Sequence, residues 1–144
     1  MPELLVATLL ITILLAAAAL LIRPKTYDAD VHNAQRRLAV LQIARGLTTY
    51  QVAHGSWPSA LTTKSQIIGS DTSEANICND LVPAYLHDLP LDPTVSLTDA
   101  SKSCADPNTI YVTGYAVRLS SDHAHVIVTA PYAEAGAQIS FTTR

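Results

Sequence analysis

Apolar residues are concentrated at the start of the chain. Leu4–Ile22 contains no charged residue, and Thr8 and Thr12 are its only polar side chains. As an α-helix this segment is about 28 Å long, close to the hydrocarbon thickness of a bilayer. The pattern therefore predicts an apolar membrane helix over residues 1–24, followed by a globular domain over residues 25–144.

One acidic residue, Glu3, immediately precedes the apolar run. In one interpretation its carboxylate lies at the headgroup boundary, in the first turn of a helix, where the helix dipole favours an anion. In the other it pairs with a positive group on a neighbouring subunit. The residues alone leave both interpretations open.

The apolar pattern changes to an amphipathic one in residues 25–54, which predict a second helical stretch. Pro24 should bend or loosen the helix just before it. Gly55 offers a C-terminal cap, and Pro58 prevents the helix from continuing. Apolar residues recur at helical spacing and predict a face wide enough to pack on a sheet. They form two adjoining stripes, Val31, Ala34, Leu38 and Leu41, and Val40, Ile43, Leu47 and Tyr50.

Residues 55–108 read as an irregular connecting loop, with a possible short helix at Glu74–Leu81. A loop of this length usually needs a function or a covalent link. The chain has two cysteines, Cys78 and Cys104, and both lie in this loop. An even pair in a Lys-poor domain rich in Thr, Ser and Asp suits an oxidising compartment and predicts a disulfide. Free thiols in a reduced cell are the alternative.

The last part of the chain, residues 109–144, changes to the pattern of β-strands. Thr109–Leu119 and His123–Ala130 are rich in β-branched and aromatic residues, and a short polar turn between them predicts a hairpin. Gln138–Thr142 alternates again and predicts a third strand. The fold class is therefore α+β. A long N-terminal helix, apolar in one half and amphipathic in the other, packs on a small antiparallel sheet of about three strands.

Composition and charge exclude several classes of protein. The chain has 144 residues, of which 49% are apolar and 15% charged, so it is not a disordered chain. Its net charge of −3 provides no basic footprint for nucleic acid. No basic residue precedes the apolar run, whereas Arg23 and Lys25 follow it, which by the positive-inside rule would keep the domain in the cytoplasm. The cysteines favour the outside, and a basic leader removed from before Met1 would reconcile the two.

Residues typical of catalysis are sparse, and we expect neither an enzyme nor a cofactor. No phosphate-binding glycine loop or nucleophile elbow is present. His123 and His125 would share one face of a strand, but exposed strand histidines explain them as well as a metal site does. Asp88 and Asp92 could supply oxygens for Ca²⁺, with polar turns beside proline as the simpler explanation.

Three local patterns together resemble the type IV pilin and pseudopilin family. Residues 2–10 (PELLVATLL) resemble the end of the prepilin signature, in which a glutamate precedes an apolar helix. Residues 35–58 resemble the amphipathic stem helix and its exit, which here reads HGSWP. Residues 81–93 resemble a proline-rich loop found in several of these proteins.

The resemblance implies a subunit that a prepilin peptidase processes and that waits in the cytoplasmic membrane with its globular domain outside. The assembly machinery would then pack it with copies of itself into an extracellular filament, used for adhesion, motility, DNA uptake or secretion. The acid near the start, here Glu3, would neutralise the terminal amine of a neighbouring subunit. The residues expected to make the assembly contacts are Glu3, Leu4, Leu5, Leu9, Leu10, Ile13, Leu14 and Pro24.

The chain departs from the family pattern in its numbering and its glycines. Glu3 lies two residues after Met1, whereas the family's acid usually lies four after the methylated first residue. No helix-breaking glycine lies in residues 4–22, so any unwinding is expected just before Pro24. A pseudopilin or minor pilin of a secretion or DNA-uptake system is the alternative, and a monomeric membrane-anchored binding module is a second.

Overall fold

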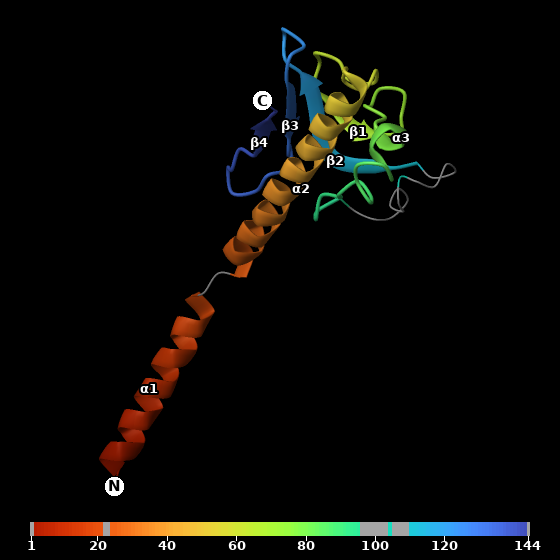
Figure 1. Ribbon diagram of the computed structural model, residues 1–144. Helices are drawn as coiled ribbons and strands as arrows, with labels where there is room; N and C mark the ends of the chain where they lie inside the picture. Colours follow the sequence, from red (N-terminus) through yellow and green to blue (C-terminus); the bar gives the residue numbers. More distant parts are fainter. Residues whose placement is uncertain (1, 22–23, 96–103, 105–109, 144) are drawn as a thin grey trace.

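The computed structural model describes residues 2–21, 24–95, 104 and 110–143, with the backbone alone in 19–21 and 24–26. Two helices come first and a small sheet with its loops follows (Figure 1). The elements in chain order are α1 (Pro2–Leu21), α2 (Pro24–His54), β1 (Gln66–Gly69), α3 (Cys78–Leu81), β2 (Val112–Leu119), β3 (Val126–Thr129) and β4 (Ser140–Thr142).

Helix α1 is exposed over its whole described length. Each residue from Pro2 to Ala18 is exposed, and Figure 1 shows α1 at one end of the molecule, away from the sheet. Within the described residues, no helix combines the length and the hydropathy required to cross a membrane. The membrane span expected from the sequence therefore stays a prediction. The unwinding expected just before Pro24 falls on residues 22–23, which lie outside the described residues.

Helix α2 crosses one face of the sheet and packs against β3, β4 and α3 (Figure 1). It ends at His54, and Gly55 follows with a φ of 73° while its N–H donates to the Gln51 carbonyl at 2.8 Å. The predicted glycine cap is therefore confirmed. Residues that carry a Cβ rarely adopt a left-handed φ, which explains why this position is a glycine.

Only one of the two predicted apolar stripes of α2 faces the core. Val40, Ile43 and Leu47 are buried, as expected. The other stripe is largely exposed, because Val31 is 39% and Leu38 69% accessible. The prediction that both stripes pack on the sheet was therefore wrong. A helix presents one face to a flat sheet, and α2 turns that face far enough to bury polar side chains beside Val40 instead.

The sheet has four antiparallel strands in the order β1-β2-β3-β4. The hairpin β2–β3 and the third strand, β4, were expected, but β1 was not, and the prediction of about three strands is corrected to four. β1 has only four residues, too few to show a period, and its pairing with β2 brings Ile67 beside Ala116. Such a strand exists because of a non-local partner. The predicted loop 55–108 thus contains a strand, and its predicted short helix is confined to α3.

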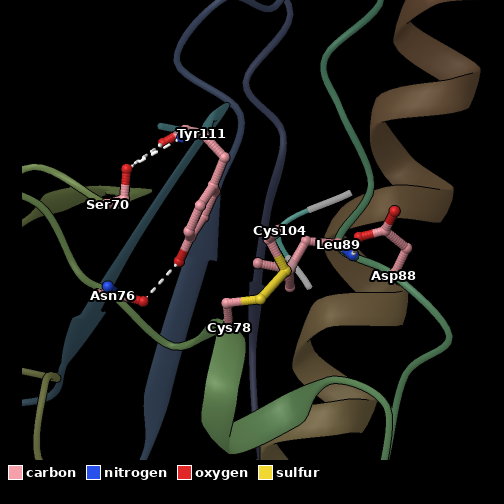
Figure 2. Close-up of a disulfide and its surroundings, with 7 residues drawn as sticks. All are labelled: Ser70, Asn76, Cys78, Asp88, Leu89, Cys104 and Tyr111. Atoms are coloured by element: carbon pink, nitrogen blue, oxygen red, sulfur yellow. Dashed lines mark hydrogen bonds between the residues drawn. A yellow bond between two sulfur atoms is a disulfide. The ribbon is translucent and has the colours of Figure 1, made fainter. Parts of the chain in front are cut away.

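The predicted disulfide joins Cys78, at the start of α3, to Cys104 (Figure 2). Both cysteines are buried. Tyr111 lies nearby, and its hydroxyl donates to the Asn76 side-chain oxygen at 2.9 Å while its backbone N–H donates to the Ser70 hydroxyl at 3.0 Å. Burial raises the pKa of Tyr111 to about 12. The disulfide therefore joins α3 to a later part of the same connecting loop.

Reducing the disulfide should destabilise the globular domain while leaving the helices formed. The sequence separation is 26 residues, and opening a loop of that size costs roughly 3–4 kcal/mol through the entropy of the unfolded chain. We expect the double variant Cys78→Ser with Cys104→Ser to lose that amount, measured by urea unfolding of the full chain in detergent. Adding reductant to the variant should change nothing. Equal stability of the two proteins would show that the loop is held by other contacts alone.

Candidate functional site

Helix α1 presents an exposed apolar surface along its described length. The six leucine and isoleucine side chains expected to make assembly contacts are each more than half exposed, at 55–73%: Leu4, Leu5, Leu9, Leu10, Ile13 and Leu14. The hydroxyls of Thr8 and Thr12 donate to carbonyls of their own helix, at 3.0 and 2.8 Å. The only polar side chains in the apolar run thus need no outside partner. Glu3, in the first turn, is the only charged residue of α1.

A second exposed apolar surface continues along the side of α2 that faces away from the sheet. We call it the outer strip. Its side chains recur every three or four residues, as the positions along one helix face do. Tyr27 and Leu38 are 73% and 69% exposed, and the polar residues Gln42 and Arg45 follow the strip. The outer strip consists of Tyr27, Val31, Ala34, Leu38 and Leu41.

Two open grooves flank α2 where the outer strip ends. One, of about 830 Å³, is lined by α2 and β4, with Leu41 and Phe141 among its lining residues. The other, of about 390 Å³, lies between α2 and the segment carrying Tyr85 and Leu86. Gly46 makes that second approach possible, because a Cβ there would lie 2.9 Å from the Leu86 Cγ. Arg45 borders both grooves.

The opposite side of α2 carries a buried charge, Arg36. Its side chain is wholly inaccessible, as is that of Asp92. The two form a bidentate pair, with Nε 2.7 Å from Asp92 Oδ2 and Nη2 3.0 Å from Oδ1. Nη2 also donates to the Thr94 hydroxyl at 3.0 Å. A planar guanidinium matches a carboxylate in this way, which is why such pairs favour arginine.

The other guanidinium nitrogen of Arg36 holds the loop between β3 and β4. Nη1 lies 2.8 Å from Glu134 Oε2 and 3.1 Å from the Asn33 side-chain oxygen. Asn33 also donates to the Glu134 carbonyl and accepts from its backbone N–H, at 2.9 and 3.0 Å. The His32 Nδ1 adds a contact to Glu134 Oε2 at 2.9 Å. Arg36 therefore joins α2 to two loops far apart in sequence.

The pKa values of both carboxyl groups reflect this cluster. Burial alone would raise the pKa of Asp92, but hydrogen bonds from Arg36 and Thr94 outweigh it and hold that pKa below its ordinary value. Hydrogen bonds from Arg36 and His32 lower the pKa of Glu134. Both carboxyl groups are thus charged at neutral pH, and they compensate the guanidinium in the interior.

The Asp92 loop reaches Arg36 by crossing β2 at a glycine. Gly114 has a φ of 82°, and a Cβ there would lie 2.8 Å from the Asp92 Cβ. The Asp92 N–H also donates to the Thr113 carbonyl at 2.8 Å. Close approach at this position needs a residue without a side chain.

This geometry leaves Asp92 without free oxygens for a cation, so the structure does not support the calcium hypothesis. Both Asp92 oxygens accept hydrogen bonds within the protein, and one Asp88 oxygen accepts from the Leu89 backbone N–H at 2.8 Å. Among the described residues, no group of three or more metal-ligating side chains is close enough together to hold a metal ion. The cluster therefore acts as a structural clamp.

Sequence reasoning missed Arg36, although a signal was present. Arg36 lies four residues before Val40, and so continues the stripe formed by Val40, Ile43 and Leu47. A charged residue on an apolar stripe either breaks the stripe or finds buried partners. Here the partners come from loops that have no periodic pattern.

Comparisons of the chain with protein-family models, with curated proteins and with solved structures found no match. The functional assignment therefore depends on the surfaces described above.

Breaking the clamp on one side should be strongly destabilising. Arg36→Met leaves the Asp92 carboxylate buried without a cation to pair with, and we expect a loss of about 3–5 kcal/mol in the free energy of unfolding. The exposed neighbour variant Arg37→Met should stay within about 0.5 kcal/mol of the parent. Adding Asp92→Leu to Arg36→Met should recover part of the loss in urea unfolding. Strictly additive losses would show that the two side chains are not coupled.

The clamp should also make the domain sensitive to acid. A carboxyl whose pKa is lowered by folding contributes stability above its unfolded pKa, and this contribution is lost as the pH falls through the folded pKa. The melting temperature should therefore be flat near neutrality and fall below about pH 4. In Asp92→Asn, the fall between about pH 4 and pH 2 should be shallower. An unchanged acid limb in that variant would exclude Asp92 as its source.

Proposed function

We propose that this protein is a structural subunit of a type IV pilus-like filament and that its apolar helix drives assembly. The observation that carries the proposal is the length of the exposed apolar surface. α1 has 20 residues and spans about 30 Å, which a bilayer can cover. The outer strip of α2 adds a second apolar surface of about 20 Å, beyond Arg23 and Lys25. A bilayer covers α1 alone, whereas neighbouring protein subunits can cover both α1 and the outer strip.

The alternative of a monomeric membrane-anchored module explains the outer strip less well. With α1 in lipid, a monomer would leave Tyr27 and Leu38 in water, at 73% and 69% exposure. Exposed apolar patches of this kind mark interaction sites. A subunit that moves from lipid into a bundle of its own copies uses both surfaces. A secretion-system pseudopilin would use both surfaces in the same way.

In this proposal Glu3 is the acid that sets the position of one subunit against another. An unpaired carboxylate in a dry helix bundle costs several kcal/mol, so it needs a positive group nearby. The resemblance supplies the terminal amine of a neighbouring subunit as that group. Assembly, rather than catalysis, is then the work of the chain.

The disulfide supports a location outside the cytoplasm. Disulfides such as Cys78–Cys104 persist in oxidising compartments. We propose that α1 lies in the cytoplasmic membrane before assembly, with the globular domain on the oxidising side. After assembly the same domain would form the outer coat of an extracellular filament.

Filaments sheared from cells that make this protein should contain it, identified by mass. We expect Glu3→Gln to keep the apolar helix but to reduce the sheared material at least about tenfold, because a neutral side chain loses the charge pairing. Glu3→Asp should retain part of it. Membrane levels of the chain serve as the control, since they should be equal in all three proteins. Normal filaments from Glu3→Gln would contradict the role given to Glu3, and chain-free sheared material from the parent would contradict the filament.

A further inference from the structure

Of the two edge strands of the sheet, β1 is covered by the chain itself. The Ala75 N–H donates to the Ile67 carbonyl at 2.8 Å, and the Gly69 N–H donates to the Ala75 carbonyl at 3.3 Å. β4 lies at the opposite edge (Figure 1). Within the described part of the chain, no segment pairs with the outer side of β4. An open edge of this kind is a template for pairing with another chain.

The outer side of β4 presents the backbone groups of Ser140 and Thr142. The Thr143 N–H donates to the Val126 carbonyl at 2.9 Å, so the backbone of Thr143 points toward β3. Because these directions alternate along an antiparallel strand, the N–H and C=O groups of Ser140 and Thr142 point away from the sheet. Edge strands are commonly protected by a charge, a proline or a bulge. β4 contains neither a charge nor a proline, and its register with β3 is regular.

The groove of about 830 Å³ lined by α2 and β4 adjoins this open edge, and we call it the β4 groove. Its α2 side runs from Leu41 to Thr49, about 12 Å, which is the length of about four extended residues. Leu41 and Phe141, which is 40% exposed, supply apolar surface. Arg45 is the charged residue of the lining, and among the described residues its guanidinium has no ion-pair partner.

We propose that the β4 groove binds an extended segment of another protein, which pairs with β4 as a fifth strand and places an acidic side chain on Arg45. The groove's threonines compete little for such a ligand, because the hydroxyls of Thr48 and Thr49 donate to carbonyls of their own helix at 2.8 and 2.9 Å. The five N–H donors of a guanidinium match a carboxylate. This site belongs to the globular domain and goes beyond the proposed filament role.

The spacing of the groove residues defines the side chains of the ligand. Leu41 and Arg45 are one helical turn apart, about 6 Å. Side chains two positions apart on one face of a strand are separated by about 6.6 Å. The bound segment therefore carries an apolar side chain and, two positions away, an acidic one. Its backbone hydrogen bonds to Ser140 and Thr142 supply affinity, and these two side chains supply specificity.

The site can be tested by calorimetric titration of a synthetic peptide into the full-length protein in detergent. The probe is the heptapeptide TTVTETT with an acetylated N-terminus and an amidated C-terminus, so that its glutamate carries the only charge. We expect it to bind, and we expect the matched peptide with glutamine in place of glutamate to bind about tenfold more weakly, because it loses a charge-assisted hydrogen bond.

Three variants separate the contributions. Arg45→Gln should bind both peptides equally, at the weaker affinity. Arg37→Gln, an exposed position on the same helix, should leave both affinities unchanged. Thr142→Pro removes an outward N–H without breaking a bond to β3, and it should weaken both peptides by about the same factor.

Several outcomes would overturn the inference. They are no binding at about 1 mM peptide, equal affinity of the two peptides for the parent protein, and unchanged affinity in Thr142→Pro. A concentration-dependent dimer without peptide, absent in Thr142→Pro, would identify a second copy as the occupant instead of another protein. Every measurement uses solubilised chains, so its result does not depend on whether sheared filaments contain the protein.

Discussion

A buried guanidinium must find a partner for every N–H and for its charge, and Arg36 imposes this constraint on the whole domain. Its partners are Asp92 and Thr94 on one loop, Glu134 on another, and Asn33 on its own helix. These loops are distant in sequence, so the domain holds them only when α2 lies in one rotation against the sheet. The clamp thereby decides which face of α2 is inside.

The same rotation decides which face of α2 is outside. Turning Arg36 and Val40 inward leaves Val31 and Leu38 on the surface. The exposed apolar surface of α1 and the outer strip of α2 then follow one another along the chain, with Arg23 and Lys25 between them. Together the two surfaces are longer than a bilayer covers, and this mismatch is the physical basis for proposing a filament of many copies. Stability and assembly are thus coupled through one helix rotation.

Local patterns in the sequence were sufficient to predict the elements that have clear local signals. The capped end of α2 at Gly55, the hairpin β2–β3 and the disulfide were all expected from nearby residues, because turns, caps and cysteine pairs carry local chemical signals. β1 was missed because four residues carry no period and its stability comes from β2. The sequence also did not show which of the two apolar stripes of α2 faces the core, since both have helical spacing.

The sequence by itself determined the α+β class, the two helical segments, the apolar character of α1 and the acid that precedes it. Those properties depend on composition and spacing along the chain, which folding does not alter. Only the tertiary structure decided that Asp92 pairs with the buried Arg36, and that Leu38 faces outward. Both depend on which residues meet across 50 or more positions of chain, as Arg36 and Asp92 do with a separation of 56. Tertiary packing decides which of these distant residues come into contact. The reason is that a buried ion pair forms only when both of its side chains are removed from water.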